Sequence, residues 1–270
     1  MSIQDPYSDP DAQAEATLEA MATRLEERGQ HPRFLRMIDK YARTLAADQP
    51  LQVLDLGTGT GVVIRQLAQL LHPESILYGA DISQRLLDAA AKLDPDKRIH
   101  WDPLQPGPLP YQDGMFDAIT MHTLLSHVPS PEDLLAEAAR ILRPGGKLIV
   151  FDADHAGTTY GLPDYATMRR TDHKLNSAIA TNPDICRQLP RLLKSAGFQL
   201  TGHSSEIISE CGHGDFWLSS VRGFAKIIPN LGILTSEEEN LWVTHMLESH
   251  EQGTFFAAGT FYTFHAEIEQ

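Results

Sequence analysis

The chain is poor in basic residues and in cysteine. It has 22 lysines and arginines against 36 aspartates and glutamates, and its formal net charge at pH 7 is −14. Because affinity for phosphate backbones comes mainly from lysine and arginine, this balance argues against a nucleic-acid partner and against a basic patch for a membrane surface. The only two cysteines, Cys186 and Cys211, do not form a disulfide framework and lack the spacing of a zinc site.

Long apolar runs are missing as well. The sequence has no stretch of about 18 apolar residues that would cross a bilayer and no signal-peptide pattern, so we expect a cytoplasmic protein with no membrane partner. Its 270 residues, 42% of them hydrophobic, are enough for one large α/β domain with insertions. Residues 1–14 are rich in proline and aspartate, and we expect them to be mobile.

A glycine-rich turn is the most informative feature that is present. Residues 53–61 read VLDLGTGTG, an apolar strand that runs into a turn, and an apolar helical pattern begins at Val62. Gly57, Gly59 and Gly61 leave the backbone open to a ligand and allow positive φ. The helix N-terminus points at the same turn. This arrangement is typical of a cradle for a nucleotide cofactor.

The spacing of the turn argues against a nicotinamide dinucleotide. The dinucleotide fingerprint is Gly-x-Gly-x-x-Gly, whereas here the third glycine is Gly61 and the following position is Val62. Asp55, two residues before the first glycine, would repel a pyrophosphate and attract a cationic amino group.

Two further acids follow predicted strands. Asp81 comes directly after the apolar residues 76–80, and 20 residues after the last glycine of the turn. An acid at that place can bind both hydroxyls of a ribose. Asp102 follows a third predicted strand over residues 98–101.

Two later segments complete an ordered series of motifs. Residues 109–119 read LPYQDGMFDAI and residues 143–150 read RPGGKLIV. Together with the glycine turn and the two acids, they resemble the motifs of class I S-adenosylmethionine (SAM)-dependent methyltransferases, and the chain looks most like the ubiquinone/menaquinone-biosynthesis type, which acts in small-molecule biosynthesis. The resemblance implies SAM as the cofactor, with these residues around it: Asp55, Gly57, Thr58, Gly59, Gly61, Asp81, Ile82, Asp102, Pro103, Leu104 and His122.

The same resemblance and the alternation of strands and helices predict an α/β fold: a Rossmann-like, doubly wound, seven-stranded sheet whose last strand is antiparallel. We expect a helical N-terminal extension over residues 1–48 and a SAM-binding domain over residues 49–270. Helical cap insertions are expected at about 153–182 and 206–252. The aromatic run at 255–264 fits the last strand.

Four histidines are candidates for a catalytic base, because their pKa lies near neutrality. His122 and His127 flank the end of the predicted fourth strand, His155 follows the fifth, and His173 lies on the helix of the first insertion. No pair of them has metal-ligand spacing with nearby acids, so we expect no metal.

The sequence therefore predicts a methyltransferase that acts on a small organic acceptor, apolar or aromatic, with O- or C-methylation favoured over N-methylation. One alternative is a SAM-binding enzyme that catalyses a cyclisation or rearrangement without methyl transfer. Another is a non-catalytic SAM-binding module. The apolar residues 216–228 could serve a homodimer or a lid.

Overall fold

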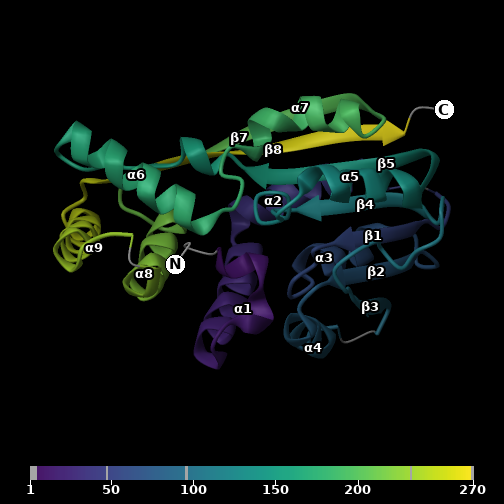
Figure 1. Cartoon of the computed structure of the whole chain (residues 1–270), viewed down its shortest axis with the longest axis horizontal. Helices are drawn as coiled ribbons and strands as arrows, with labels where there is room; N and C mark the ends of the chain where they lie inside the picture. Colours follow the sequence, from purple (N-terminus) through teal and green to yellow (C-terminus); the bar gives the residue numbers. More distant parts are fainter. Residues whose placement is uncertain (1–4, 47, 95–96, 232, 269–270) are drawn as a thin grey trace.

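One large mixed sheet organises the chain in the computed structural model, which describes residues 5–46, 48–94, 97–231 and 233–268 (Figure 1). Five parallel strands form its first part in the order β3-β2-β1-β4-β5. Their bounds are β1 Gln52–Leu56, β2 Ile76–Asp81, β3 Ile99–Pro103, β4 Phe116–His122 and β5 Leu142–Ala153. The order turns around at β1, whose two neighbours are β2 and β4, so the sheet has a topological switch point there.

The other strands extend the sheet in the antiparallel sense. The last strand, β8 (Phe255–Ile268), pairs with β5 and with β7 (Phe198–Gly212). This confirms the predicted fold class and the antiparallel last strand. A two-residue strand, β6 (Thr159–Tyr160), also pairs with β8 and is the eighth strand among the described residues. Strands β7 and β8 run beyond the end of β5, since their pairing continues to Gly212 and Phe255.

Helices cover both faces of the parallel part, as a doubly wound sheet requires. On one face α2 (Pro32–Ala42) and α3 (Val62–Leu70) bury their apolar residues, and on the other α5 (Pro131–Ile141) and α7 (Ile185–Ser195) do so. Because adjacent residues of a strand point to opposite faces of the sheet, the strands contribute side chains to the cores on both faces. α4 (Gln84–Lys92) connects β2 to β3, and Ser83 caps it by accepting a hydrogen bond from Leu86 N.

The cap helices gather around the far end of the β7–β8 pair (Figure 1). They are α6 (Tyr165–Ile179), α8 (Phe216–Leu231) and α9 (Ser236–Glu251). A capping box between Thr235 and Glu238 starts α9. Up to residue 226, the large apolar side chains of α8 are buried in the chain's own core: Phe216, Trp217, Leu218, Val221 and Phe224. These five therefore give no argument for a homodimer, and the apolar residues 227–228 of the same prediction lie outside the side chains that the structure describes.

The N-terminal segment corrects the sequence prediction. Residues 1–4 lie outside the described part, but two short 3-10 turns, Pro6–Ser8 and Pro10–Ala12, precede α1 (Glu15–Gln30). Asp5 and Asp9 cap these turns through their side chains. Residues 5–12 are thus ordered against the rest of the chain, and the expectation of mobility is wrong for them.

The two cysteines, Cys186 and Cys211, are free. Within the described ranges, the helices are all too short or too polar to span a bilayer.

Candidate active site

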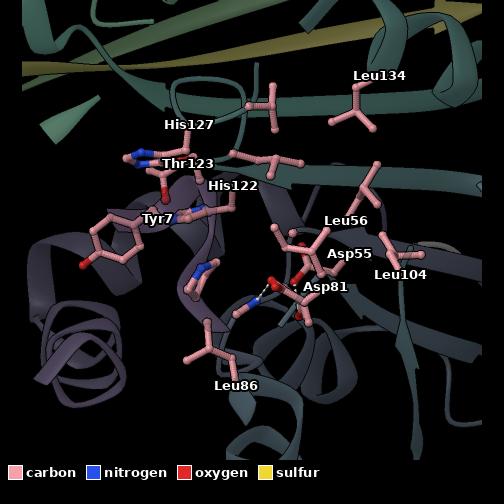
Figure 2. A pocket seen from close by; sticks show the side chains of 18 of the residues that line it. Tyr7, Asp55, Leu56, Asp81, Leu86, Leu104, His122, Thr123, His127 and Leu134 are labelled. Carbon is pink, nitrogen blue, oxygen red and sulfur yellow. Dashed lines mark hydrogen bonds between the residues drawn. The ribbon is translucent and has the colours of Figure 1, made fainter. Parts of the chain in front are cut away.

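A cavity of about 910 Å³ opens at the carboxyl ends of β1 and β4, next to the switch point of the sheet (Figure 2). Its walls come from the glycine turn, from the ends of β2 and β4, and from α1 with the N-terminal turns. Ligand sites typically measure about 300–1,000 Å³. The cavity is therefore near the upper end of the usual size.

The glycine turn adopts the backbone conformation that its composition predicts. Gly57 and Gly61 have φ values of +71° and +80°. A Cβ on Gly61 would lie 2.5 Å from the Trp101 ring, and a Cβ on Gly57 would lie 2.4 Å from Leu124. Gly57 faces the cavity, whereas Gly61 is not among the residues that line it. The role of Gly61 in the structure is therefore to let the turn pack against Trp101.

Asp55 lies at the floor of the cavity and is buried (Figure 2). Its Oδ2 accepts a hydrogen bond of 2.6 Å from Thr58 Oγ1, and its Oδ1 accepts one of 2.6 Å from Thr120 Oγ1. Burial disfavours the charged form and raises the pKa of Asp55 to about 6, although both hydroxyls oppose this effect. A cationic ligand group beside Asp55 would favour the ionised form.

Asp81 organises the turn from the end of β2. Its Oδ2 accepts a hydrogen bond of 2.8 Å from Gly59 N, and its Oδ1 accepts one of 2.9 Å from Ser83 N. Burial raises the pKa of Asp81. Each carboxylate oxygen has a second lone pair, so the pair of ribose hydroxyls can still donate to it. The neighbouring Ile82 also lines the cavity.

Of the three cofactor residues predicted at the end of the third strand, β3, only one reaches the cavity. Leu104 lines it, but Asp102 and Pro103 do not. Asp102 accepts a hydrogen bond of 2.9 Å from the hydroxyl of Tyr111. In this structure its carboxylate is therefore held by Tyr111 rather than turned toward the cavity.

His122 and His155 line the cavity but are poor bases. Burial lowers the pKa of His122 well below its usual value and that of His155 to about 3. His122 Nδ1 shares a hydrogen bond of 2.8 Å with the Tyr41 hydroxyl, and its ring stacks on Phe151. His155 Nε2 is buried without a partner among the described residues. Both imidazoles are neutral walls of the cavity.

The structure does not bring His173 to the cavity. The opposite face of α6 is buried against β6, where Asp172 accepts hydrogen bonds from Thr159 Oγ1 and Tyr160 N. His173 is one residue further along the helix and is exposed to solvent. A role as a lid base is therefore not supported.

His127 has the arrangement of an oriented base. Its Nδ1 lies 2.7 Å from Asp5 Oδ2. The Tyr7 ring packs beside it, with ring centroids 5.0 Å apart (Figure 2). Thr181 N also donates to Asp5 Oδ2, at 3.1 Å. A carboxylate that holds one imidazole nitrogen fixes the ring and leaves the other nitrogen free to accept a proton.

Sequence reasoning missed Asp5, Tyr7 and Arg28. The pairs Asp5-Pro6 and Asp9-Pro10 did carry a signal, because an aspartate before a proline is typical of a cap and first turn. Arg28 gave none. Its place in the cavity wall, where Nη2 donates to Thr123 Oγ1 at 3.0 Å, is set by tertiary packing.

Comparison with known proteins agrees with the site. Residues 54–150 match the family model of a methyltransferase domain. An uncharacterized 37.1 kDa protein in transposon TN4556 of Streptomyces fradiae is 30% identical over 214 residues, which are 77% of this chain and 60% of that protein. A ubiquinone/menaquinone biosynthesis C-methyltransferase of Desulfotalea psychrophila is 35% identical over 127 residues, 46% of this chain and 49% of that enzyme. The chain thus spans between about half and 60% of the length of these curated relatives.

Among solved structures, phosphoethanolamine N-methyltransferase 2 of Haemonchus contortus, in complex with S-adenosylhomocysteine, superposes with a TM-score of 0.60 at 15% identity, over 100% of this chain and 61% of that one. The chain thus shares the fold of that structure and carries a methyltransferase domain over residues 54–150. More particularly, it resembles the ubiquinone/menaquinone type, and the resemblance predicted from the sequence is confirmed.

Proposed function

We propose that this chain transfers the methyl group of SAM to a small organic acceptor. The observation that carries the proposal is one cavity with two unlike ends, the glycine turn with Asp55 and Asp81 at one and the Asp5–His127 pair at the other. The proposed cofactor contacts are the predicted residues that line the cavity: Asp55, Gly57, Thr58, Gly59, Asp81, Ile82, Leu104 and His122.

The residues of this chain would serve the reaction by enclosure, alignment and proton removal. When bound, SAM supplies an electrophilic methyl group and leaves as S-adenosylhomocysteine. Asp81 would hold the ribose and Asp55 the amino group, which fixes the direction from which the acceptor must approach. Alignment of this kind lowers the barrier by several kcal/mol. The free nitrogen of His127 would take the proton that the acceptor loses.

Apolar side chains make up much of the cavity wall. Leu25 and Leu124 lie beside Gly59 and Gly57 of the turn, whereas Phe34 lies under the Arg28 guanidinium, at the end away from the acids. A small aromatic or otherwise apolar acceptor suits such a wall.

Calorimetric titration with SAM tests the cofactor, with NADH as the negative control. We expect micromolar binding of SAM and none of NADH. Asp81→Ala removes two charge-assisted hydrogen bonds from the turn and the ribose contact, so SAM affinity should fall about 10- to 100-fold. Asp88→Ala, an exposed acid on the neighbouring α4, is the matched control and should bind as the wild type does.

Product analysis tests the reaction. A gain of one methyl group with release of S-adenosylhomocysteine supports methyl transfer. An altered product without either would support a cyclisation or rearrangement, and SAM binding without any turnover would support a binding module. If Asp81→Ala binds SAM as tightly as Asp88→Ala does, the cofactor assignment is wrong.

A further inference from the structure

Two arginines of α1 line the cavity at the end opposite the acids. Arg24 and Arg28 are one helical turn apart. The Nη2 of Arg28 donates to Thr123 Oγ1, its Nε is buried without a partner, and its Cζ lies 5.0 Å above the Phe34 ring. Arg24 donates to Ser220 Oγ at 3.1 Å and to Ser219 O at 3.4 Å. Their polar contacts within the described residues are thus to neutral oxygens.

Neither guanidinium has a carboxylate partner in the part of the chain that the structure describes. Asp152 is a buried carboxylate whose charge raises the pKa of Arg28, but it accepts hydrogen bonds from Ser126 N and Ala153 N and does not line the cavity. A partly buried cation without a counter-charge is unfavourable. Burial accordingly lowers the pKa of Arg28 to about 10. An anionic ligand atom would compensate this charge.

The cavity is therefore polarised. Asp55 and Asp81 are at the cofactor end, and the two arginines are at the cap end, near His127 and His155. A ligand with an amino group and a sulfonium fits the acidic end, and the cationic end is left for the second ligand.

We infer that Arg28, assisted by Arg24, binds a negatively charged oxygen of the methyl acceptor, which places the acceptor among phenols, enols and carboxylic acids. The inference rests on the proposed function. Arg28 would orient the oxygen through the free edge of its guanidinium, because a planar guanidinium binds oxyanions with directed hydrogen bonds.

The same contact would assist the chemistry. A positive charge beside a hydroxyl favours its ionised form, so the acceptor would reach the cavity as the anion or lose its proton there with less help from a base. For an O-methylation, the anion's lone pair forms the new bond to the methyl carbon while the carbon–sulfur bond breaks and its electron pair stays on sulfur. The proton goes to His127 or to water.

SAM itself offers the same chemistry through its α-carboxylate, and the experiment must separate the two sources. The probes for the acceptor are simple phenols, enolised 1,3-diketones and aromatic carboxylic acids, each paired with its neutral O-methyl ether or amide. The probes for the cofactor are SAM and 5′-methylthioadenosine, which lacks the amino-acid part. Binding of each is measured by calorimetry, that of the acceptors in saturating S-adenosylhomocysteine and also without it.

Three variants are compared with the wild type. Arg28→Gln removes the charge, Arg28→Lys keeps it without the planar fork, and Arg33→Gln is the control, an exposed arginine at the start of α2. Thr123→Val removes the hydroxyl that holds Arg28 without changing the size of the side chain, and thus tests the site if Arg28→Gln fails to fold.

We expect wild type to bind an acidic probe at least 10-fold more tightly than its neutral partner. Arg28→Gln should lose about 10- to 100-fold of the affinity for the acidic probe. Arg28→Lys and Thr123→Val should lose less of it, and Arg33→Gln should bind the probe as the wild type does. The affinity for SAM should be unchanged in all four variants. The inference is overturned if no acidic probe binds the wild type, if neutral partners bind equally well, or if Arg28→Gln leaves the preference intact.

Two other outcomes separate a failure of the acceptor assignment from a failure of the proposed function. If Arg28→Gln weakens SAM but not 5′-methylthioadenosine, the anion is the α-carboxylate of SAM and the acceptor assignment is wrong. If wild type does not bind SAM, the proposed function fails, and the acid preference measured without nucleotide still decides whether Arg28 binds an oxyanion.

Discussion

Replacing Asp55 by asparagine should stabilise the unliganded protein and weaken its binding of SAM. The carboxyl group is 1% exposed and receives hydrogen bonds from Thr58 and Thr120. Asparagine has nearly the same shape. The hydroxyl that faces its amide nitrogen can rotate to accept a hydrogen bond, while the other hydroxyl continues to donate to the amide oxygen. The variant removes the charge and keeps the packing.

The expected size follows from the pKa of about 6, compared with the usual 3.8. A carboxyl whose native pKa is raised binds its proton more tightly in the folded chain, so its contribution to stability is complete below pH 4 and is lost as the pH rises through 6. The loss is about 3 kcal/mol at neutral pH. Allowing about 1 kcal/mol for a weaker hydrogen-bond arrangement, Asp55→Asn should gain about 2 kcal/mol at pH 7 and little at pH 4.

Calorimetric melting from pH 4 to pH 8, with and without saturating SAM, measures both effects. Without SAM, the Tm of the variant should exceed that of the wild type by several degrees at pH 7, and the two should converge toward pH 4. With SAM the order should reverse or the gap should close, because the ionised carboxylate then has a cationic partner. Asp113→Asn, whose side chain is 79% exposed, is the control and should show only the small loss of its exposed ion pair with Arg140, with SAM affinity unchanged.

A variant that is less stable than the wild type at pH 7, or one that binds SAM with undiminished affinity, would refute this reasoning. The first result would mean that the hydrogen bonds of the carboxylate outweigh its desolvation. The second would mean that Asp55 only shapes the turn.

Two further comparisons of variants separate chemistry from packing. His127→Gln should lower kcat by about 100-fold or more with unchanged SAM affinity. Asp5→Asn should lower kcat less and alter the pH profile of kcat, and His100→Gln, at an exposed histidine, should change neither kcat nor its pH profile. An equal loss of kcat in all three variants would exclude His127 as the base. Gly61→Ala should lower the Tm more than Gly197→Ala does. Both glycines have positive φ, but only at Gly61 would a Cβ meet a side chain, the Trp101 ring, and this clash should cost about 1–3 kcal/mol of stability in addition. Equal effects on the Tm would show that Trp101 moves aside.

The parallel half of the fold could be predicted because its signals are local. Each strand, turn and cap there occupies a few consecutive residues, as at Asp55 to Gly61 and at Asp81. The residues of the site could be predicted only where they lie within such a local pattern. Asp5 contacts His127 across 122 residues of sequence, and Arg28 contacts Thr123 across 95. No periodicity or spacing encodes such contacts.

The wrong interpretations have the same cause. A proline-rich acidic segment is mobile unless something distant binds it, and here its partners are His127, Thr181 and Ser83. His173 is solvent-exposed because Asp172 and its neighbours on α6 bury the other face, which depends on where β6 lies. Strand β7 continues to Gly212, into the second expected insertion, because it pairs with β8 along its whole length.

The N-terminal turns connect two sides of the cavity. Asp5 binds His127, which follows β4, while Asp11 accepts hydrogen bonds from Ser83 Oγ and Gln84 N at the start of α4. This has a practical consequence for handling the protein. An affinity tag or cloning remnant added before residue 1 would be only four residues from a buried carboxylate that holds the proposed base. For the assays described above the tag belongs at the other end, after β8, whose last described residue lies at the opposite side of the molecule from the cap helices (Figure 1).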